Sequence, residues 1–344
     1  MKIIYVGTRL QVNGATKVAI SHCNILHKRG HQVRLAVLGA NSLDWSSPFI
    51  PVEYISNLRM LHIDEKELIV VLDCLVANWF VRQYGHNRVI SFVQVDEPKL
   101  YHDPQLVNAA QNAFALSNPK IVVSKYLQDI LKEYGSNSEI IPPAISKAIY
   151  YPAKRDAPEV SKPFKVLLVG SYSHPLKQIP QAYLALKYLQ HLGVDVRLIR
   201  LVRKVETVTP VGLEVEWFVN PPQDMIGEIY RSADALLSAS SSEGFGLPLL
   251  EAMATGIPFV TTDNGGSRDL IPDQSLVVKV GDTAAMGRAL YQLASDRTVW
   301  QHLRTAGLER AERWSWDYIG IELERYFKVV CGTAFKKWRM IKND

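Results

Sequence analysis

The stretch of sequence that decides the fold is ALLSASSSEGFGLPLLEAMATG, residues 235–256. It begins with an apolar run typical of a buried strand and passes through a glycine-containing turn into a helical stretch that ends at Gly256. Pro248 suits the first turn of that helix, because its missing N–H would have no intrahelical partner there in any case. A strand, a glycine turn and a helix in this order are typical of a βα unit in a parallel sheet.

The turn of this unit predicts a binding site for a diphosphate. The backbone N–H groups of Phe245, Gly246 and Leu247 stand at the start of the helix, where free N–H groups and the helix dipole favour an anion. Two carboxylates flank the turn, Glu243 in the loop and Glu251 eight residues further on. Carboxylates accept paired hydrogen bonds from vicinal hydroxyls, so the two acids suit a molecule with a sugar at each end. The alternative is that Glu251 only complements the helix N-terminus and that Glu243 is a solvated loop residue.

Similar units recur along the chain, and 344 residues with 47% hydrophobic side chains are enough to bury two cores. A polar, proline-containing segment at residues 151–158 precedes a fresh strand at Phe164 and is the expected linker. We therefore predict an α/β protein with two doubly wound, Rossmann-like domains that face a central cleft, where the ligand is expected. The predicted strands are Ile3–Val6, Gln32–Val37, Leu68–Leu72, Val89–Val93, Ile121–Ser124, Val166–Val169, Val196–Leu201, Ala235–Ser238, Pro258–Thr262 and Leu276–Val278.

Composition narrows the class of protein. The three cysteines are widely separated, which argues against a disulfide framework or a structural zinc site and favours a reducing, cytoplasmic compartment. A net charge of +5 permits an anionic ligand but is far from the dense basic composition of a nucleic-acid-binding protein. The first residues lack the longer apolar stretch and small-residue cleavage site expected of a signal peptide, and no apolar stretch of about 18 residues occurs in the sequence. The run at residues 335–342 mixes cations with large apolar groups, which predicts either peripheral contact with the inner face of a membrane or a solvated basic tail.

Residues 241–260 resemble the signature of family 4 glycosyltransferases, two-domain enzymes of the GT-B fold with a Glu-x7-Glu motif. The resemblance extends over nearly the whole chain, in order, at Asn13-Gly14-Ala15, residues 28–33, residues 141–144 with 151–152, residues 229–234, residues 263–266 and Ser315-Trp316. It implies an acceptor-side domain over residues 1–155, a nucleotide-sugar donor domain over residues 156–310, and C-terminal helices over residues 311–344 that return toward the first domain.

The same resemblance implies roles for individual residues. Glu251 would bind the ribose of the nucleotide, Glu243 would contact the transferred sugar, and the backbone at residues 245–247 would hold the diphosphate or the sugar hydroxyls. Gly14, in the first βα unit, and Val219, near the expected position of the base, are further donor-binding candidates. The resemblance also implies retention of the anomeric configuration without a metal, and no cofactor beyond the nucleotide-sugar donor. Independently, the sequence contains no Asp-x-Asp, the usual signature of metal-dependent sugar transfer.

The loop after Gly170 departs from the family. Relatives commonly carry an arginine directly after this glycine and a lysine about six residues later; here Lys177 is present, but Ser171 replaces the arginine. The missing cation would weaken the stabilisation of the leaving diphosphate by roughly 1.5–3 kcal/mol, the value of one charge-assisted hydrogen bond. His174, Arg200 and Arg203 are the candidates to replace it. Without the resemblance, Lys177 would be interpreted as an ordinary lysine at a helix entry.

In the first domain, residues 91–101 place polar groups after a strand, where a cleft-facing loop is expected. They look like the Gln-Asp-x-Glu-Pro loop of a rhamnosyltransferase-like subgroup, with Val95 inserted before Asp96. Asp96 is the candidate acid that would orient the acceptor hydroxyl or stabilise an oxocarbenium-like centre. The alternative is a capping acid beside a solvated one. Asp73, at the end of another strand, is a weaker candidate of the same kind.

These observations favour hexosyl or deoxyhexosyl transfer from a nucleotide sugar to a saccharide or lipid-linked saccharide, as in envelope polysaccharide assembly. Two alternatives remain open. One is a sugar-nucleotide epimerase or phosphorylase on the same architecture, and the other is a nucleotide-sugar-binding partner subunit that has lost catalysis. Ser171 favours the partner subunit, whereas the presence of Glu243, Glu251 and Lys177 favours the transferase.

Overall fold

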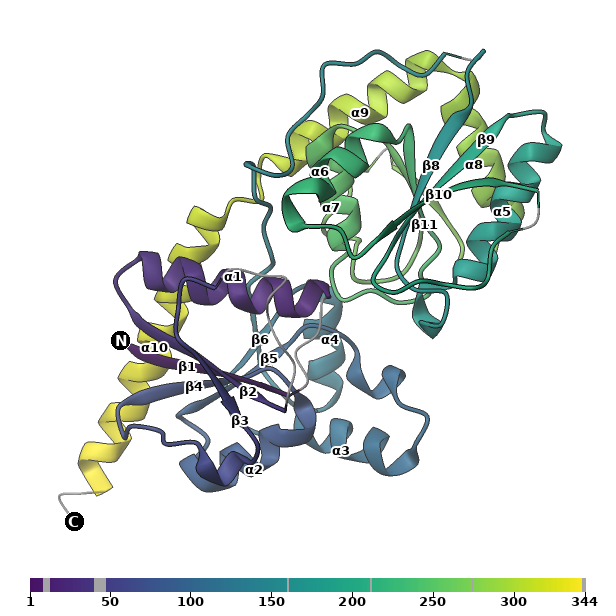
Figure 1. The fold of residues 1–344 in the computed structure, drawn as a ribbon. Helices are drawn as coiled ribbons and strands as arrows, with labels where there is room; N and C mark the ends of the chain where they lie inside the picture. Colours follow the sequence, from purple (N-terminus) through teal and green to yellow (C-terminus); the bar gives the residue numbers. More distant parts are fainter. Residues whose placement is uncertain (9–12, 40–47, 160, 211, 274, 342–344) are drawn as a thin grey trace. The chain divides into compact units, whose positions relative to one another are not determined.

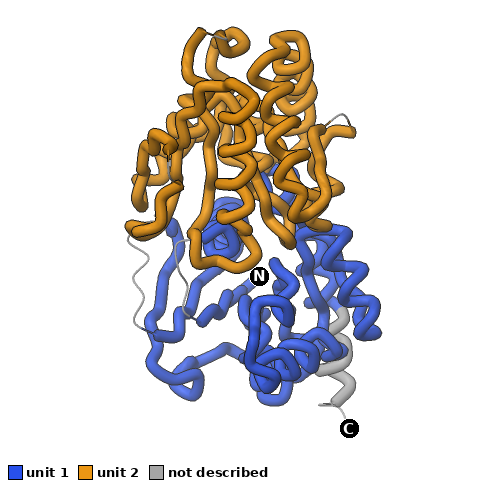
Figure 2. The backbone as a smooth tube through the Cα atoms, turned by 90° about the vertical axis from the view of Figure 1, so that its right-hand side faces the viewer, with its two compact units in different colours: residues 1–144, 316–344 blue, residues 145–315 orange. Residues whose placement is uncertain are grey.

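The structure, a computed structural model, describes residues 1–8, 13–39, 48–159, 161–210, 212–273 and 275–341, with side chains described up to residue 332. The chain divides into two compact units, residues 1–144 with 316–344 (unit 1) and residues 145–315 (unit 2), which are coloured separately in Figure 2. Each unit contains one parallel sheet with helices on both faces (Figure 1). The predicted α/β fold with two doubly wound sheets is therefore confirmed.

In the described part of unit 1, all strand pairs are parallel and the order is β3-β2-β1-β4-β5-β6-β7. Its elements are β1 (Lys2–Thr8), α1 (Gly14–Lys28), β2 (Gln32–Leu38), β3 (Val52–Ile55), η1 (Leu58–Met60), β4 (Glu67–Val71), α2 (Cys74–Tyr84), β5 (Val89–Val93), η2 (Glu97–Leu100), α3 (Pro104–Phe114), β6 (Lys120–Val122), α4 (Lys125–Glu133), β7 (Glu139–Ile140) and α10 (Trp316–Ile341).

The alternation of side chains along β1 explains the two layers of helices. Successive residues of a strand point to opposite faces of the sheet. Ile4 and Val6 belong to the buried cluster that α2 and α3 cover. Tyr5 points to the other face, where its ring meets His22 of α1, and His22 meets Trp316 at the start of α10. Both faces are apolar, so β1 reads as the continuous hydrophobic run expected of a central parallel strand.

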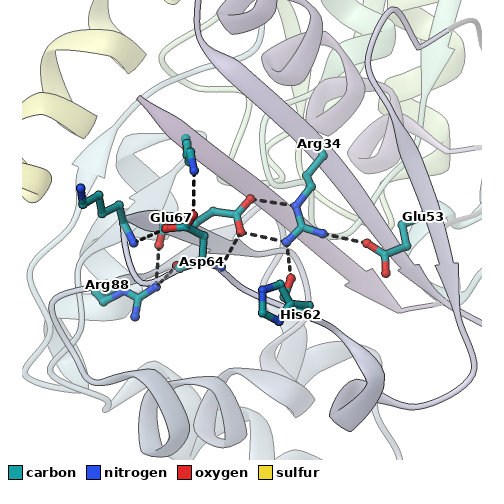
Figure 3. Close-up of polar contacts among 8 residues, drawn as sticks. Arg34, Glu53, His62, Asp64, Glu67 and Arg88 are labelled. Carbon is teal, nitrogen blue, oxygen red and sulfur yellow. Dashed lines mark hydrogen bonds and ion pairs between the residues drawn. The ribbon is translucent and has the colours of Figure 1, made fainter.

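A polar network joins the amino ends of the unit 1 strands (Figure 3). The guanidinium of Arg34 on β2 donates to both carboxylate oxygens of Glu67 on β4, each at 2.8 Å, and to Glu53 on β3 at 2.7 Å. Arg88 donates to the backbone carbonyls of Asp64 and Glu67. Ligands of doubly wound sheets bind at the opposite, carboxyl ends of the strands. This network therefore fixes the register of the strands and is not a candidate site.

The described part of unit 2 has the strand order β10-β9-β8-β11-β12-β13, again with every pair parallel. Helices α5 and α8 pack against one face of this sheet, where a large apolar cluster is buried. Helices α6 and α7 pack against each other on the opposite side of the sheet (Figure 1). The elements are β8 (Phe164–Val169), η3 (Pro175–Lys177), α5 (Ile179–His191), β9 (Val196–Val202), β10 (Glu214–Val219), α6 (Gln223–Ser232), β11 (Ala235–Ser238), α7 (Leu247–Thr255), β12 (Phe259–Thr262), β13 (Leu276–Val278), α8 (Thr283–Ser295) and α9 (Arg297–Ala311).

Each sheet reverses its winding direction at one point. In unit 1 the reversal lies between β1 and β4, and in unit 2 it lies between β8 and β11. The loops that leave two neighbouring strands there run to opposite faces of the sheet and open a crevice at the carboxyl ends, the usual ligand site of this architecture. In unit 2 a ligand site is therefore expected at the loops after β8 and β11, which comprise residues 170–178 and 239–246.

No helix in the described ranges is long and apolar enough to cross a membrane. The basic run at residues 335–342, which predicted peripheral membrane contact, lies outside the described side chains.

Candidate functional site

Lys177 and Glu243 meet at the switch point of unit 2. The ammonium of Lys177, from the loop after β8, lies 2.7 Å from Glu243 Oε1, from the loop after β11. Ser240 Oγ donates to the same carboxylate oxygen at 2.7 Å, and the two loops are also joined by a backbone hydrogen bond of 2.8 Å from Ser241 to Leu176. The fold thus brings together two predicted site residues that are 66 positions apart in sequence.

Gly170 leaves room for the side chain of Lys177. Its backbone has φ 116°, a conformation that side chains disfavour, and a Cβ at this position would stand 3.2 Å from Cγ of Lys177. Because the glycine leaves this space open, the aliphatic part of Lys177 passes over the end of β8 and reaches Glu243. A small cavity beside the pair is lined by Lys177, Ser238, Ser240 and Pro248 among others.

The pair is charged at neutral pH. Burial alone would raise the pKa of Glu243, but the charge of Lys177, its hydrogen bond and that of Ser240 together lower it. The pKa of His174, on the same loop, is lowered by burial and then by the charge of Lys177, against a smaller opposing effect of Glu243. His174 therefore carries no charge at pH 7, and Lys177 supplies the positive charge of this loop.

The turn before α7 has the shape that the sequence predicts. Gly246 caps the helix in the left-handed conformation, with φ 98°, and a Cβ there would stand 3.1 Å from Cβ of Ser267. A second loop supports the turn from behind, where Gly266 approaches the carbonyl of Glu243 so closely that any side chain at position 266 would overlap it. The first turn of α7, which includes Leu247, therefore starts at the carboxyl end of β11, as an anion site at a helix N-terminus requires.

Phe245 lies in the turn before α7, and Glu251 lies within α7. Phe245 is 5% exposed, and its ring packs edge-on against Trp314 with centroids 5.2 Å apart. Glu251 is 8% exposed, and its two carboxylate oxygens accept hydrogen bonds from the hydroxyls of Tyr150 and Tyr230, both at 2.7 Å. Neither tyrosine was predicted from the sequence as part of the site. Their sequence separations from Glu251, 101 and 21 residues, carry no periodic signal that would have linked them.

Arg200 does not take over the role of the arginine that relatives carry at the position of Ser171. Its side chain is fully buried, and its guanidinium is ion-paired with Glu206 at 2.7 Å and bonded to the carbonyl of Gly170 at 2.8 Å. The other carboxylate oxygen of Glu206 accepts from the backbone N–H of Tyr172 at 2.6 Å. Arg200 thus holds the loop after β8 in place from within, while Ser171 Oγ lies 3.1 Å from Ser173 Oγ.

The remaining donor-binding candidates lie at element ends. Gly14, in unit 1, is the first residue of α1, where the side chain of Asn13 caps the helix by accepting from Thr16 N–H at 2.8 Å. Val219, in unit 2, is the last residue of β10 and is 39% exposed. Asn220 follows it in the left-handed conformation, with φ 45°. Both candidates lie at carboxyl-end loops of their sheets, and their role stays a prediction.

Asp96 and Glu97 share a loop in unit 1 but differ in state. Asp96 is 7% exposed and is ion-paired with Lys99 at 2.8 Å. The pKa of Glu97 is raised to about 8, first by burial and further by the negative charge of Asp73, although hydrogen bonds from Cys74 oppose the shift. Glu97 Oε2 has no hydrogen-bond partner among the described residues. Glu97 is therefore a neutral carboxylic acid at pH 7, which the sequence analysis did not foresee.

The described residues include no group of three or more His, Cys, Asp or Glu side chains placed to hold a metal ion.

Comparison with known proteins finds a family match that covers most of unit 2. Residues 153–313 match the sequence profile of the family Glycosyl transferases group 1. Residues of this chain are 35% identical, over 129 residues, to probable sucrose-phosphate synthase 2 of Arabidopsis thaliana, in an alignment that covers 36% of this chain and 12% of that protein. The chain therefore spans only a small part of the curated relatives that it matches.

Two solved structures share the fold along nearly the full chain. The sucrose-phosphate synthase of Thermosynechococcus elongatus superposes with a TM-score of 0.77 at 15% identity, covering 97% of this chain and all of that one. HepE of Anabaena, solved in complex with UDP-glucose, superposes with a TM-score of 0.78 at 17% identity, covering 96% of this chain and all of that one. At these identities the likeness speaks for the fold alone, which is GT-B, as predicted. Residues 153–313 thus match the family Glycosyl transferases group 1, within a chain that has the GT-B fold.

Proposed function

We propose that this chain is a glycosyltransferase that takes a sugar from a nucleotide-diphosphate sugar and passes it to a hydroxyl of a saccharide or lipid-linked saccharide. The observation that carries the proposal is the Lys177–Glu243 pair, which lies at the switch point of unit 2 beside the start of α7. A cation and a helix N-terminus on one side of a carboxylate are suited to a diphosphate that carries a sugar.

In this proposal each group of the motif has one task. Lys177 and the N–H groups at residues 245–247 neutralise the charge that develops on the leaving diphosphate. Glu243 accepts hydrogen bonds from hydroxyls of the transferred sugar, and Glu251 accepts those of the ribose. The bond between the anomeric carbon and the diphosphate oxygen breaks, a bond to the acceptor oxygen forms, and the proton of the acceptor hydroxyl passes to the leaving nucleoside diphosphate. Retention of configuration and independence from a metal are parts of the proposal that rest on the family resemblance.

UDP-glucose is the donor that we propose to test first, because the Anabaena structure of the same fold contains it. On the acceptor side, we propose that Asp96 orients the acceptor hydroxyl, with a cytoplasmic site of action in envelope polysaccharide assembly. The relatives named above are sucrose-phosphate synthases rather than rhamnosyltransferases, so the rhamnosyltransferase-like character of residues 91–101 rests on that loop alone.

A second candidate function is a nucleotide-sugar-binding partner subunit with little turnover. Ser171 favours it, because the loop after β8 lacks the expected arginine and Arg200 is fully buried against Glu206. The two functions share the donor site and differ only in turnover.

The test is incubation of the protein with a panel of nucleotide sugars, followed by the thermal shift and the release of nucleoside diphosphate. Stabilisation by UDP and slow release of UDP from UDP-glucose are the results expected of a transferase without its acceptor. Stabilisation without release, also in the presence of saccharide acceptors, would favour the partner subunit. Absence of stabilisation by every nucleotide would refute the donor site.

A further inference from the structure

Two buried tyrosines hold the second carboxylate of the motif. Glu251 Oε1 accepts from the hydroxyl of Tyr150 and Oε2 from that of Tyr230, both at 2.7 Å. Tyr230 is 0% exposed and comes from α6, while Tyr150 is 2% exposed and comes from the turn at residues 146–150. Because the three residues belong to three separate segments of unit 2, the arrangement is assembled by the tertiary fold.

Gly227 brings the turn against α6. Its Cα faces the backbone carbonyl of Ile149, and a Cβ at position 227 would overlap that carbonyl oxygen. Arg231, one helical turn further along, donates to the same carbonyl at 3.1 Å. With backbone against backbone, the rings of Tyr150 and Tyr230 lie edge to face, with centroids 6.0 Å apart and planes at 83°. The turn and the helix thus present both hydroxyls to one carboxylate.

The tyrosines have a physical reason to be donors here. A carboxylate withdrawn from water is costly unless hydrogen bonds replace the lost solvation, and bonds donated to a charged group are the stronger ones. Burial, and next the negative charge of Glu251, raises the pKa of both Tyr150 and Tyr230. Both phenols therefore keep their protons. One donor on each oxygen also fixes the rotation of the carboxylate, which a single hydrogen bond would leave loose.

We propose that Tyr150 and Tyr230 are positioning residues that hold the Glu251 carboxylate for the 2′- and 3′-hydroxyls of a nucleotide, so that the site selects ribonucleotides over 2′-deoxyribonucleotides. The proposal rests on the proposed function in one respect, because it takes Glu251 as the group that binds the ribose. A carboxylate can accept about four hydrogen bonds, so it can receive the two phenols and a vicinal diol together. The orientation that the phenols impose decides whether both hydroxyls of the diol are reached at once.

The test compares Tyr150→Phe, Tyr230→Phe and the double variant with Tyr291→Phe, a matched control on the exposed side of α8 in the same unit. Calorimetry measures the Kd of UDP and of 2′-deoxy-UDP for each protein, and release of UDP from UDP-glucose gives kcat and KM. The melting temperature of each variant shows whether unit 2 stays folded.

We expect each single variant to weaken UDP binding about fivefold to tenfold, less than the loss of a hydrogen bond to a charged group, because Glu251 itself remains, and the double variant to weaken it further. Binding of 2′-deoxy-UDP should change less than about twofold, so the preference for the ribonucleotide falls, and KM should rise while kcat stays within about twofold. A merely structural role would instead weaken both nucleotides equally and lower the melting temperature. Equal losses for UDP and 2′-deoxy-UDP, or an unchanged preference, would overturn the inference.

The outcome also separates this inference from the proposed function. If the native protein binds UDP and releases it from UDP-glucose while the tyrosine variants keep the full ribonucleotide preference, only the inference fails. If the native protein binds UDP without any turnover, the preference ratio still tests the inference although the transferase proposal fails. If the native protein binds no nucleoside diphosphate at all, both fail together.

Discussion

Each unit has a small cavity at the carboxyl ends of two neighbouring strands, β8 and β11 in unit 2 and β4 and β5 in unit 1, and the ionisable groups at the two cavities differ in charge state. In unit 2 the cavity is lined by Lys177, and Glu243 beside it has a lowered pKa. In unit 1 the cavity is lined by Asp73, Cys74 and Glu97, and the pKa of Glu97 is raised to about 8. The same sheet topology therefore supports a charged pair in one unit and a neutral buried acid in the other.

This difference shows why topology alone does not define a site. A carboxylate stays charged when a cation lies within hydrogen-bond distance, as Lys177 lies from Glu243, and it takes up a proton when burial dominates, as at Glu97. The unit 2 end presents groups that suit an anionic ligand with hydroxyls. At the unit 1 end, Thr8 donates its hydroxyl to Asp73, whereas Glu97 Oε2 has no hydrogen-bond partner among the described residues. Removing one charge at a time tests whether these charge states have the consequences expected for each unit.

The largest effect is expected from removing the cation at the unit 2 switch point. Lys177→Met keeps the length of the side chain but removes the charge that the diphosphate would meet, so we expect kcat/KM for UDP-glucose to fall about 100-fold or more, as when one preorganised donor to a developing negative charge is lost. Release of UDP measures it. Lys187→Met, at an exposed position of α5 in the same unit, is the control and should retain activity. Full activity of Lys177→Met would remove the lysine from the proposed mechanism.

Glu97→Gln tests the neutral acid of unit 1. The folded-state pKa of Glu97 is about 8 and the ordinary value is 4.5, so the folded state holds more protons between these values and stability falls as pH rises through this window. From pH 6 to pH 7.5 the native protein should lose about 2 kcal/mol of unfolding free energy relative to the Gln variant. Unfolding in urea, monitored by hydrogen exchange in peptides from unit 1, measures this difference in unfolding free energy. Parallel pH curves for Glu97→Gln, the native protein and the exposed-site control Glu65→Gln would contradict it.

His22 provides the corresponding test on the acid side. The histidine is fully buried between Phe92 and Trp316, and burial lowers its pKa from 6.5 to about 3. Between these values the unfolded state binds the extra proton, so stability falls as pH drops below 6.5. Over the step from pH 6 to pH 5 we expect a loss of about 1 kcal/mol that His22→Phe does not show.

The same exchange measurement in unit 1 reports the effect, with His102→Phe at an exposed position as the control. A His22→Phe variant that loses stability over this pH step as steeply as the native protein would show that another group titrates.

Much of the fold was predictable from the sequence because the central strands are continuous apolar runs. Each of the ten predicted strands is present, with ends that differ by a few residues at most. The prediction missed β3, β7 and β10. The first two have four and two residues, and β10 reads EVEWFV, with two glutamates in an edge strand. Edge strands need less apolar surface, so the hydrophobic signal that reveals a central strand is weak in them.

The candidate site was predictable where its residues lie in one local motif. Glu243, the glycine turn and Glu251 are all within one strand-turn-helix unit, whose geometry follows from chain-local rules. The hydrogen bonds from Tyr150 to Glu251 and the buried pair of Arg200 with Glu206 depend on which loops the folded sheet brings together. Lys177 was predicted as a site residue only through the resemblance, since its position alone is that of an ordinary helix-entry lysine, and its ion pair with Glu243 was not predicted.

The smallest effect is expected at Asp96, and it tests the division of tasks between the units. Asp96 lies in unit 1 and is paired with the exposed ammonium of Lys99, an ion pair of a kind that contributes about 1 kcal/mol or less. If Asp96 orients the acceptor as proposed and makes no contact with the nucleotide, Asp96→Asn should change the Kd of UDP less than about twofold. Calorimetry measures the Kd of UDP for Asp96→Asn in unit 1 and for Lys177→Met in unit 2. A loss of UDP affinity at Asp96→Asn as large as that at Lys177→Met would mean that the nucleotide site includes the loop at residues 94–101, and the proposal that Asp96 acts on the acceptor and not on the nucleotide would have to be abandoned.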